Sequence, residues 1–271
     1  MGKTIILTKE QEQQIIHNYV DLRLGQKKAG AFIPVSDKIV KKVLVKNNIP
    51  IKIIQETNIN KFNINHRYFQ TQSADVGYWL GILSSDGCIA SNENQIYIEL
   101  QRGDRELLEK LNISIENERP VKDYVTGRGY ENSKLYFYSK QIKADLALYN
   151  IIPNKTYSSN FIYPDKLKPD FVPDYIRGLF DGDGCIKLTS NTLTWQIDCS
   201  SKDILLHLQD FLNQREIQTK IISMPKTNIS IYRLYCYGVE KCYKIYNLLY
   251  STQSNLFLLR KKEKFKQLLQ L

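Results

Sequence analysis

Two kinds of hydrophobic pattern follow one another along this chain. In residues 202–212 apolar positions recur every three or four residues, so that Ile204, Leu205 and Leu208 share one face of a predicted helix. In residues 185–189, 194–198 and 231–237 apolar and polar positions alternate, which predicts half-buried strands. The same reasoning predicts strands at 95–101 and 134–140, and helices at 104–111, 141–149, 174–180, 241–249 and 256–269.

Two segments nearly repeat one another: WLGILSSDGCI at residues 79–89 and IRGLFDGDGCI at residues 176–186. Each is an apolar helical run that contains a glycine, ends in Asp-Gly and continues into strand-like residues. The two aspartates are 183 − 86 = 97 residues apart, and the same offset pairs Tyr138 with Tyr235. A repeat in register over this length predicts two copies of one unit, at 72–160 and 170–271, joined by a Pro-bounded linker at 161–169.

Residues 1–71 do not share this repeat. Residues 11–22 read as a helix, and Ser36 can cap a second helix whose apolar residues include Val40 and Leu44. This order fits a DNA-binding helix-turn-helix and equally a plain helical hairpin. The candidate DNA contacts of the second helix are Lys38, Lys41 and Lys42.

The charge of the chain is concentrated near its N-terminus. Of a formal net charge of +10, residues 1–70 contribute 12 − 5 = +7, which suggests polyanion binding or a solubilising surface. Five scattered cysteines and three distant histidines argue against a zinc site, a disulfide framework and a Ser-His-Asp hydrolase. We see no signal peptide and no run long enough to span a bilayer, so we expect a protein that is not secreted and has no membrane partner.

The paired acids carry the candidate chemistry. A glycine inside a helix costs about 1 kcal/mol relative to alanine, and Gly81 and Gly178 occupy matched positions. A close crossing of the two helices explains both glycines and would place Asp86 and Asp183 side by side. Two adjacent carboxylates require a cation, and Mg²⁺ with oxygen ligands suits metal-assisted phosphodiester hydrolysis.

Both motifs resemble the signature of the LAGLIDADG homing endonucleases of the single-chain, two-motif type, and the resemblance covers residues 72–271. It implies an α+β fold in which two αββαββα repeats form a pseudo-twofold saddle over duplex DNA, here preceded by a small, mostly helical N-terminal domain. It implies that Asp86 and Asp183 hold the metal, together with the backbone at Ser85 and Gly182. Lys155 and Lys261 are the best candidates for the catalytic lysines of the family; alternatively, they are surface lysines that hold a phosphate farther out.

The first motif departs from the family pattern, because Ser84 and Ser85 replace the usual acid and small residue. This leaves open whether the two DNA strands are cut at equal rates. The resemblance implies Mg²⁺ as cofactor, with Mn²⁺ able to substitute and Ca²⁺ permitting binding without efficient cleavage.

Strand alternation sorts the polar residues that would face DNA in such a saddle. Ile186 and Leu188 are expected to face the core, as are Trp195 and Ile197, so their neighbours face the DNA. The candidate contacts are Tyr97, Glu99, Gln101, Lys134, Tyr136, Tyr138 and Lys140 in the first copy, and Lys187, Thr189, Thr194, Gln196, Asp198, Arg233 and Tyr235 in the second.

The sequence therefore predicts a monomeric, Mg²⁺-dependent, site-specific double-strand DNA endonuclease with an N-terminal DNA-binding extension. Such an enzyme would work in a bacterial or phage-infected cytoplasm or in an organelle, encoded by an intron or a phage mobile element. An RNA-splicing maturase and a non-catalytic DNA-binding regulator are the alternatives on the same fold. A regulator would be expected to lose the acids, and both are present.

Overall fold

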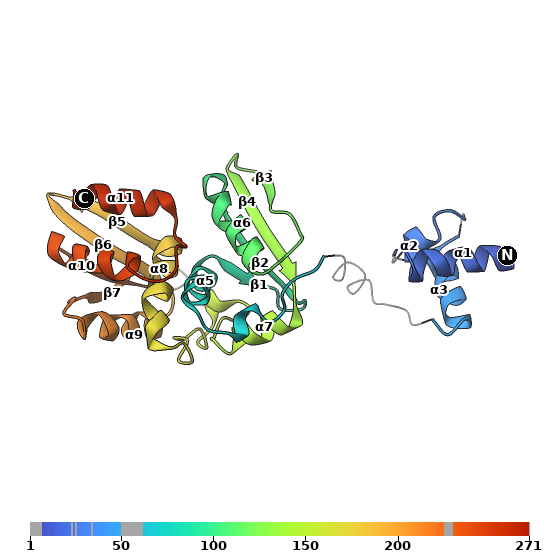
Figure 1. Ribbon diagram of the computed structural model, residues 1–271, viewed down its shortest axis with the longest axis horizontal. Coiled ribbons are helices and arrows are strands. Elements are labelled where there is room, and N and C mark those ends of the chain that lie inside the picture. The colour runs from blue at the N-terminus through green and yellow to red at the C-terminus, as the bar shows by residue number, and fades with distance from the viewer. Residues whose placement is uncertain are drawn as a thin grey trace. The chain divides into compact units, whose positions relative to one another are not determined.

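The computed structural model describes residues 7–22, 24, 26–33, 35–49, 62–224 and 230–270. The chain divides into two compact units, Met1–Asn63 and Ile64–Leu271 (Figure 1). Each unit has a hydrophobic core of its own.

The smaller unit contains three helices, α1 (Lys9–Val20), α2 (Gln26–Ala29) and α3 (Asp37–Lys46). Thr8 and Gln11 form a reciprocal capping box at the start of α1, which satisfies two backbone N–H groups there. Helix α3 buries Val40, Val43 and Leu44 in the small core. Ser36 stands at its N-cap, but the expected capping hydrogen bond of the serine side chain is not formed among the described residues.

The larger unit confirms the predicted fold class: two αββαββα repeats follow one another in the chain. A short segment of 3₁₀ helix precedes each motif helix, and one more helix follows the second repeat. The first repeat contains α5 (Ala74–Ser85), β1 (Gly87–Ile89), β2 (Gln95–Gln101), α6 (Arg105–Ser114), β3 (Lys122–Val125), β4 (Glu131–Tyr138) and α7 (Lys140–Ala147). The second contains α8 (Val172–Asp183), β5 (Gly184–Thr189), β6 (Thr192–Cys199), α9 (Lys202–Asn213), β7 (Lys220–Met224), β8 (Ile231–Tyr237) and α10 (Val239–Tyr250), and α11 (Leu259–Leu269) follows it.

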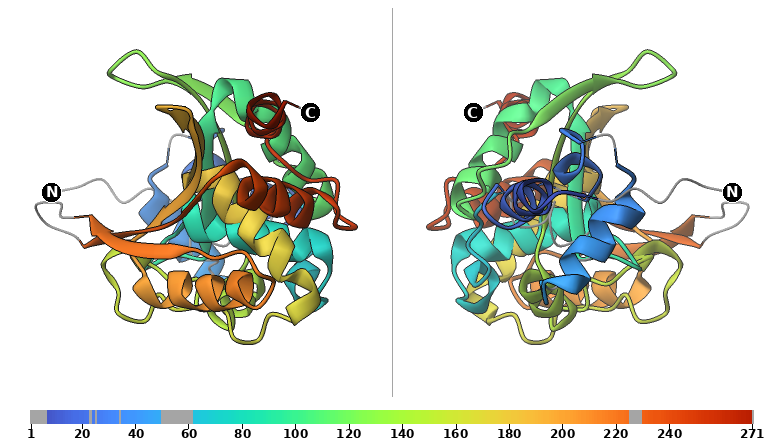
Figure 2. Two further views of the ribbon diagram at one scale, coloured as in Figure 1. Left: turned by 90° about the vertical axis from the view of Figure 1, so that its left-hand side faces the viewer. Right: turned by 90° about the vertical axis from the view of Figure 1, so that its right-hand side faces the viewer.

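Each repeat builds one antiparallel sheet of four strands, in the order β1-β2-β4-β3 and β5-β6-β8-β7. Helices pack against one face of each sheet: α6 contacts β2 and β4, and α9 and α10 contact β6 and β8. Figure 2, left, shows the helices of the second repeat gathered on one side of its strands. The opposite face of each sheet carries the alternating polar side chains.

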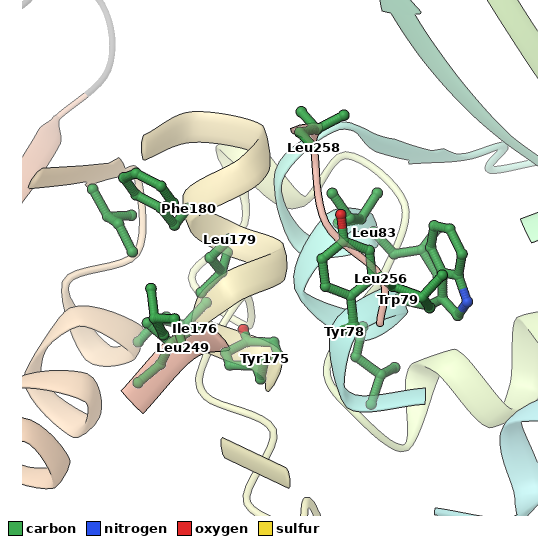
Figure 3. Close-up of a cluster of buried hydrophobic side chains, with 14 of the residues drawn as sticks. Tyr78, Trp79, Leu83, Tyr175, Ile176, Leu179, Phe180, Leu249, Leu256 and Leu258 are labelled. Atoms are coloured by element: carbon green, nitrogen blue, oxygen red, sulfur yellow. The ribbon is translucent and has the colours of Figure 1, made fainter. Parts of the chain in front are cut away.

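The motif helices α5 and α8 cross in the centre of the larger unit, and both are buried over most of their length. A Cβ atom at Gly81 would lie 2.8 Å from Cα of Gly178, and one at Gly178 would lie 2.9 Å from Cα of Gly81. Only glycine allows the two backbones to come this close, which is the physical reason for the matched pair. Around the crossing, Tyr78, Trp79, Tyr175 and neighbouring aliphatic side chains fill the core (Figure 3).

The offset of 97 does not hold in the strands. Gly87 pairs with Ile98, whereas its counterpart Gly184 pairs with Ile197, so β2 and β6 correspond at 197 − 98 = 99. The second hairpin is two residues longer and closes through Ser190 and Asn191, both with positive φ, as a two-residue turn requires. Tyr138 therefore corresponds to Tyr237, because these residues pair with Gln95 and Thr194 respectively, and not to Tyr235 as the sequence offset predicts.

Three further sequence expectations are corrected by the structure. Leu188 does not face the core: it lies on the extended tip of the second hairpin and is 54% exposed. Lys140 is not a strand residue, because β4 ends at Tyr138 and Lys140 begins α7. Gln196 lies on the polar face of its strand but is only 7% exposed, between Cys185 and Tyr235 on the neighbouring strands.

Candidate metal and nucleic-acid site

The ends of the two motif helices meet beside their acids. Asp86 is the C-cap residue of α5, and Asp183 is the last residue of α8. Gly182 packs so tightly against Ser85 and Asp86 that an added Cβ atom would lie 2.5 Å from Oδ2 of Asp86. The helix crossing thus brings together the two motif ends that the sequence repeat singled out.

The local environment is unfavourable for two unbalanced negative charges. Burial of the Asp86 carboxyl group away from water raises its pKa. A hydrogen bond from the Ser85 hydroxyl at 3.2 Å partly offsets this rise. Asp183 remains exposed to solvent on one side, but packing around its carboxyl group and the nearby carboxylate of Asp86 raise its pKa to about 6. A cation between the two side chains would relieve both effects.

One lysine from each repeat lies against the backbone of its motif end. Lys155 Nζ donates hydrogen bonds to the carbonyl oxygens of Ser85 at 3.1 Å and Gly87 at 2.5 Å. Lys261 Nζ donates to those of Gly182 at 3.0 Å and Gly184 at 2.8 Å. The four carbonyls correspond at the offset of 97, since 182 − 85 and 184 − 87 both equal 97, so the two lysines are pseudo-equivalent.

Desolvation lowers the pKa of both lysines, while the nearby carboxylates of Asp86 and Asp183 raise it. The carbonyls of Ser85 and Gly182, which the sequence suggested as metal ligands, are the ones that accept these ammonium hydrogen bonds. A carbonyl oxygen has a second lone pair, so this contact leaves one acceptor position on each.

The residues present fit a hard divalent cation. Within the described ranges no group of three or more His, Cys, Asp and Glu side chains is placed to hold a metal. The donor set is therefore two carboxylates, from Asp86 and Asp183, with backbone carbonyl oxygens nearby. An oxygen-only set with few protein ligands suits Mg²⁺, which retains several waters and completes its sphere with phosphate oxygens.

The polar faces of the two sheets hold the predicted nucleic-acid contacts. In the first sheet Lys134 lies 3.7 Å above the ring of Tyr97 and 3.6 Å from Glu99. In the second sheet Arg233 forms an ion pair with Asp198. Lys187 and Thr189 are exposed on β5, and Gln101 is exposed at the end of β2, whereas Thr194, Tyr136, Tyr138 and Tyr235 are half-buried.

The sequence reasoning missed two cations on the first sheet. Arg119 lies 4.5 Å above the ring of Tyr136 and donates to its hydroxyl at 3.0 Å, and Lys122 lies 5.3 Å from the same ring. Arg119 lies in the segment that leads into β3, and Lys122 is the first residue of β3, a fully exposed edge strand that lacks the alternation of a half-buried strand. The signal that could have found them is the Val121–Val125 stretch, which is bounded by a proline and carries two β-branched residues.

Helix α11, which follows the second repeat, contacts the first repeat through an ion pair. Arg260 Nε and Nη2 donate to the buried carboxylate of Asp104, just before α6, at distances of 2.8 to 3.0 Å. Arg260 directly precedes Lys261, so this ion pair holds the start of α11 next to the motif ends.

Two family models match this chain, one over each repeat. Residues 75–155 match the family model of the WhiA LAGLIDADG-like domain, and residues 170–250 match that of the LAGLIDADG-like domain. The larger unit holds two LAGLIDADG-like domains. The matched ranges begin within or just before the motif helices α5 and α8 and extend to the end of each repeat.

Individual relatives are distant from this chain. It is 26% identical over 164 residues to the uncharacterized protein MJ0314 of Methanocaldococcus jannaschii, and this match covers 54% of each chain, so the chain matches about half the length of this relative. The N-terminal LAGLIDADG domain of DUF199/WhiA aligns with a TM-score of 0.44 and 16% identity, covering 70% of this chain and 91% of that one. The I-LtrWI LAGLIDADG homing endonuclease bound to target DNA aligns with a TM-score of 0.48 and 11% identity, covering 76% and 91%.

A membrane-spanning helix is not found in the described part of the chain, where every helix is too short or too polar to cross a bilayer.

Proposed function

We propose that the larger unit binds double-stranded DNA across the polar faces of its two sheets. The observation that carries this proposal is the repeated arrangement of these faces, each with cations stacked on tyrosines or paired with acids across neighbouring strands. Such side chains can contact base edges in the major groove and phosphates beside it. Lys38, Lys41 and Lys42, exposed on α3 of the smaller unit, supply further phosphate contacts.

Within this DNA-binding role, the motif ends support metal-dependent phosphodiester hydrolysis. Asp86 and Asp183 would hold the divalent cation, and Lys155 and Lys261 would fix the motif backbone and offset negative charge near the scissile phosphate. A bound cation supplies a lowered pKa for attacking water and stabilises charge on the phosphate oxygens. The raised carboxylate pKa values support this role, because a cation favours the ionised acids.

A non-catalytic DNA-binding regulator is the second candidate. The match of residues 75–155 to the family model of the WhiA LAGLIDADG-like domain favours it. Both candidates need the same DNA-binding faces and differ only in what the paired acids do.

A cleavage and binding assay separates the two candidates. Purified full-length protein is incubated with DNA that flanks its own gene, in Mg²⁺ or in Ca²⁺, and cut and bound DNA are measured. A nuclease cuts in Mg²⁺, and Asp86→Asn or Asp183→Asn lowers the rate by about 100-fold or more, the scale seen when one group that stabilises charge is removed. Asp165→Asn, an exposed acid in the connecting segment, is the matched control and should cut normally.

Each outcome of this assay assigns the function. Specific binding without cleavage in any metal establishes the regulator and removes the nuclease. Full double-strand cleavage by both single variants removes the paired-acid mechanism. Absence of binding to any duplex overturns the DNA-binding proposal itself.

A further inference from the structure

Asp198 and Arg233 form a close contact on the polar face of the second sheet. They lie directly opposite one another on β6 and β8. Arg233 Nε donates to Asp198 Oδ1 at 2.6 Å and Nη2 donates to Oδ2 at 2.7 Å, so the ion pair is bidentate. The side chain of Arg233 is 22% exposed and that of Asp198 is 32% exposed, so the pair is partly shielded by its neighbours but still reaches the surface.

The first sheet carries a different pair at the corresponding place. Glu99 and Lys134 also lie opposite one another, and they correspond to Asp198 and Arg233 at the strand offset of 99. Their N–O distance is 3.6 Å, and the ammonium group also lies over the ring of Tyr97. The first repeat thus places the flexible ammonium group of Lys134 where the second repeat places the planar guanidinium group of Arg233, which is held by two hydrogen bonds.

The bidentate contact determines which edge of the guanidinium group remains to contact DNA. Nε and Nη2 are held by Asp198, while Nη1 has no hydrogen-bond partner among the described residues. The outer edge of the group, formed by Nη1 and the second hydrogen of Nη2, is held in a fixed plane. This edge matches the O6 and N7 acceptors of guanine in the major groove, and little side-chain entropy remains to be lost on binding.

We infer that Arg233 selects a guanine in the half-site that lies under the β5–β8 sheet, and that Asp198 is the positioning residue that aims it. The corresponding Lys134 cannot make the same planar double contact, so the preferred target is asymmetric between its half-sites. This inference rests on the proposed binding of double-stranded DNA and adds the base that one residue reads.

The test is a binding selection from a randomised duplex library, using the full chain in Ca²⁺ and the same chain with single substitutions. The wild type should enrich sequences with a guanine at one position of one half-site, by roughly 10-fold or more over the other bases. Arg233→Lys should abolish that preference. Asp198→Asn should reduce it at least several-fold, while binding to non-specific DNA is kept or strengthened because a negative charge is removed.

Glu99→Gln is the matched control, because it alters the corresponding acid of the other repeat. It should leave the guanine position unchanged. Thermal melting of each variant confirms that the fold is retained, and Arg233→Lys keeps the charge so that loss of specificity is not loss of general attraction.

Three results would overturn the inference. Unchanged base preferences in Arg233→Lys and Asp198→Asn would show that neither residue takes part in readout, while DNA binding itself stands. An equal loss of affinity across all sequences in Arg233→Lys would place this residue on a phosphate. If the wild type retains no duplex and enriches no sequence in either Ca²⁺ or Mg²⁺, the proposed DNA binding and this inference are both overturned.

Discussion

The hydroxyl group of Tyr78 on α5 donates a hydrogen bond of 2.8 Å to Oδ2 of Asp181 on α8. At the offset of 97 its counterpart, Tyr175, donates to the hydroxyl of Ser84 at 3.3 Å. The crossing of the motif helices is therefore joined by two pseudo-symmetric hydrogen bonds, of which only one ends on an acid. The replacement of an acid by Ser84 in the first motif keeps the contact and removes the charge.

This difference predicts unequal effects of two matched substitutions. Tyr78→Phe removes a donor from a fully buried carboxylate and should lower the free energy of unfolding by roughly 2 kcal/mol. Tyr175→Phe removes a longer bond between neutral groups and should cost no more than about 1 kcal/mol. Urea denaturation of both variants measures the difference, and equal losses would contradict the charge-based ranking.

The matched glycines at the crossing predict a steric effect. Gly81→Ala places a methyl group 2.8 Å from the backbone nitrogen of Leu179 and from Cα of Gly178, where backbone has to move. We expect a loss of about 3 kcal/mol or more in the free energy of unfolding, at the upper end for an overpacked core. Gly127→Ala is the control, since its added Cβ would meet nothing within 4 Å, and it should change stability by less than about 0.5 kcal/mol.

Asp181 predicts a dependence of stability on pH. Its side chain is 1% exposed, and burial raises its pKa to about 6 from the ordinary value of 3.8, although Tyr78 and the Leu258 N–H donate to it. A folded-state pKa above the unfolded value gives stability that is fully present below pH 3.8 and is lost as the pH rises through about 6. The full effect is about 3 kcal/mol.

Asp181→Asn removes this titration. Between pH 4 and pH 7 the free energy of unfolding of wild type should fall more steeply than that of the variant, and the difference between the two curves isolates this residue from the other acids. Chemical denaturation at four or five pH values supplies the curves. Parallel curves would mean that Asp181 titrates normally in the folded protein.

The smaller unit predicts a change in the salt dependence of DNA binding. A shortened chain that begins at Ile64 should fold, because the larger unit has its own core, but it should bind DNA more weakly and protect a shorter stretch. Each phosphate contact that is lost should reduce the slope of log K against log salt by about 0.9. Lys38→Gln, Lys41→Gln and Lys42→Gln combined should reproduce much of this change, whereas an unchanged slope and footprint would assign these lysines to another partner.

Much of the larger unit could be predicted from the sequence, because local and repeated signals agreed. The matched Gly81 and Gly178 indicated a close helix crossing, and the Asp-Gly pairs marked the helix ends. Alternation placed Ile186 and Trp195 in the core, where they lie. These features depend on short-range periodicity and on backbone sterics, which a sequence displays directly.

The correspondence between the strands of the two repeats could not be predicted, for a specific reason. The second hairpin gains two residues, and the first repeat regains two in the 3₁₀ turn Arg102–Asp104 before α6, so the helices on both sides keep the offset of 97. A shift of two also preserves which face each side chain occupies, so alternation gives no warning. The correspondence of the Asp198–Arg233 pair with the Glu99–Lys134 pair depends on the offset of 99 and was therefore not predicted.

The positions of Lys155 and Lys261 also could not be predicted from a constant offset between the repeats. Lys155 and Lys261 are 261 − 155 = 106 residues apart, yet they reach pseudo-equivalent carbonyls. The resemblance of the flanking segments to a family suggested these lysines, and repeat arithmetic would have missed them.

The ion pair between Arg260 and Asp104 has a mechanical consequence. Two bodies that touch only where two helices cross can rock about that point like a hinge. The Arg260 fork is a second attachment between residues 156 positions apart in the chain, and it restrains such rocking. We therefore expect this ion pair, together with the packed helix crossing, to limit movement of the two motif ends, and with them Asp86 and Asp183, relative to one another.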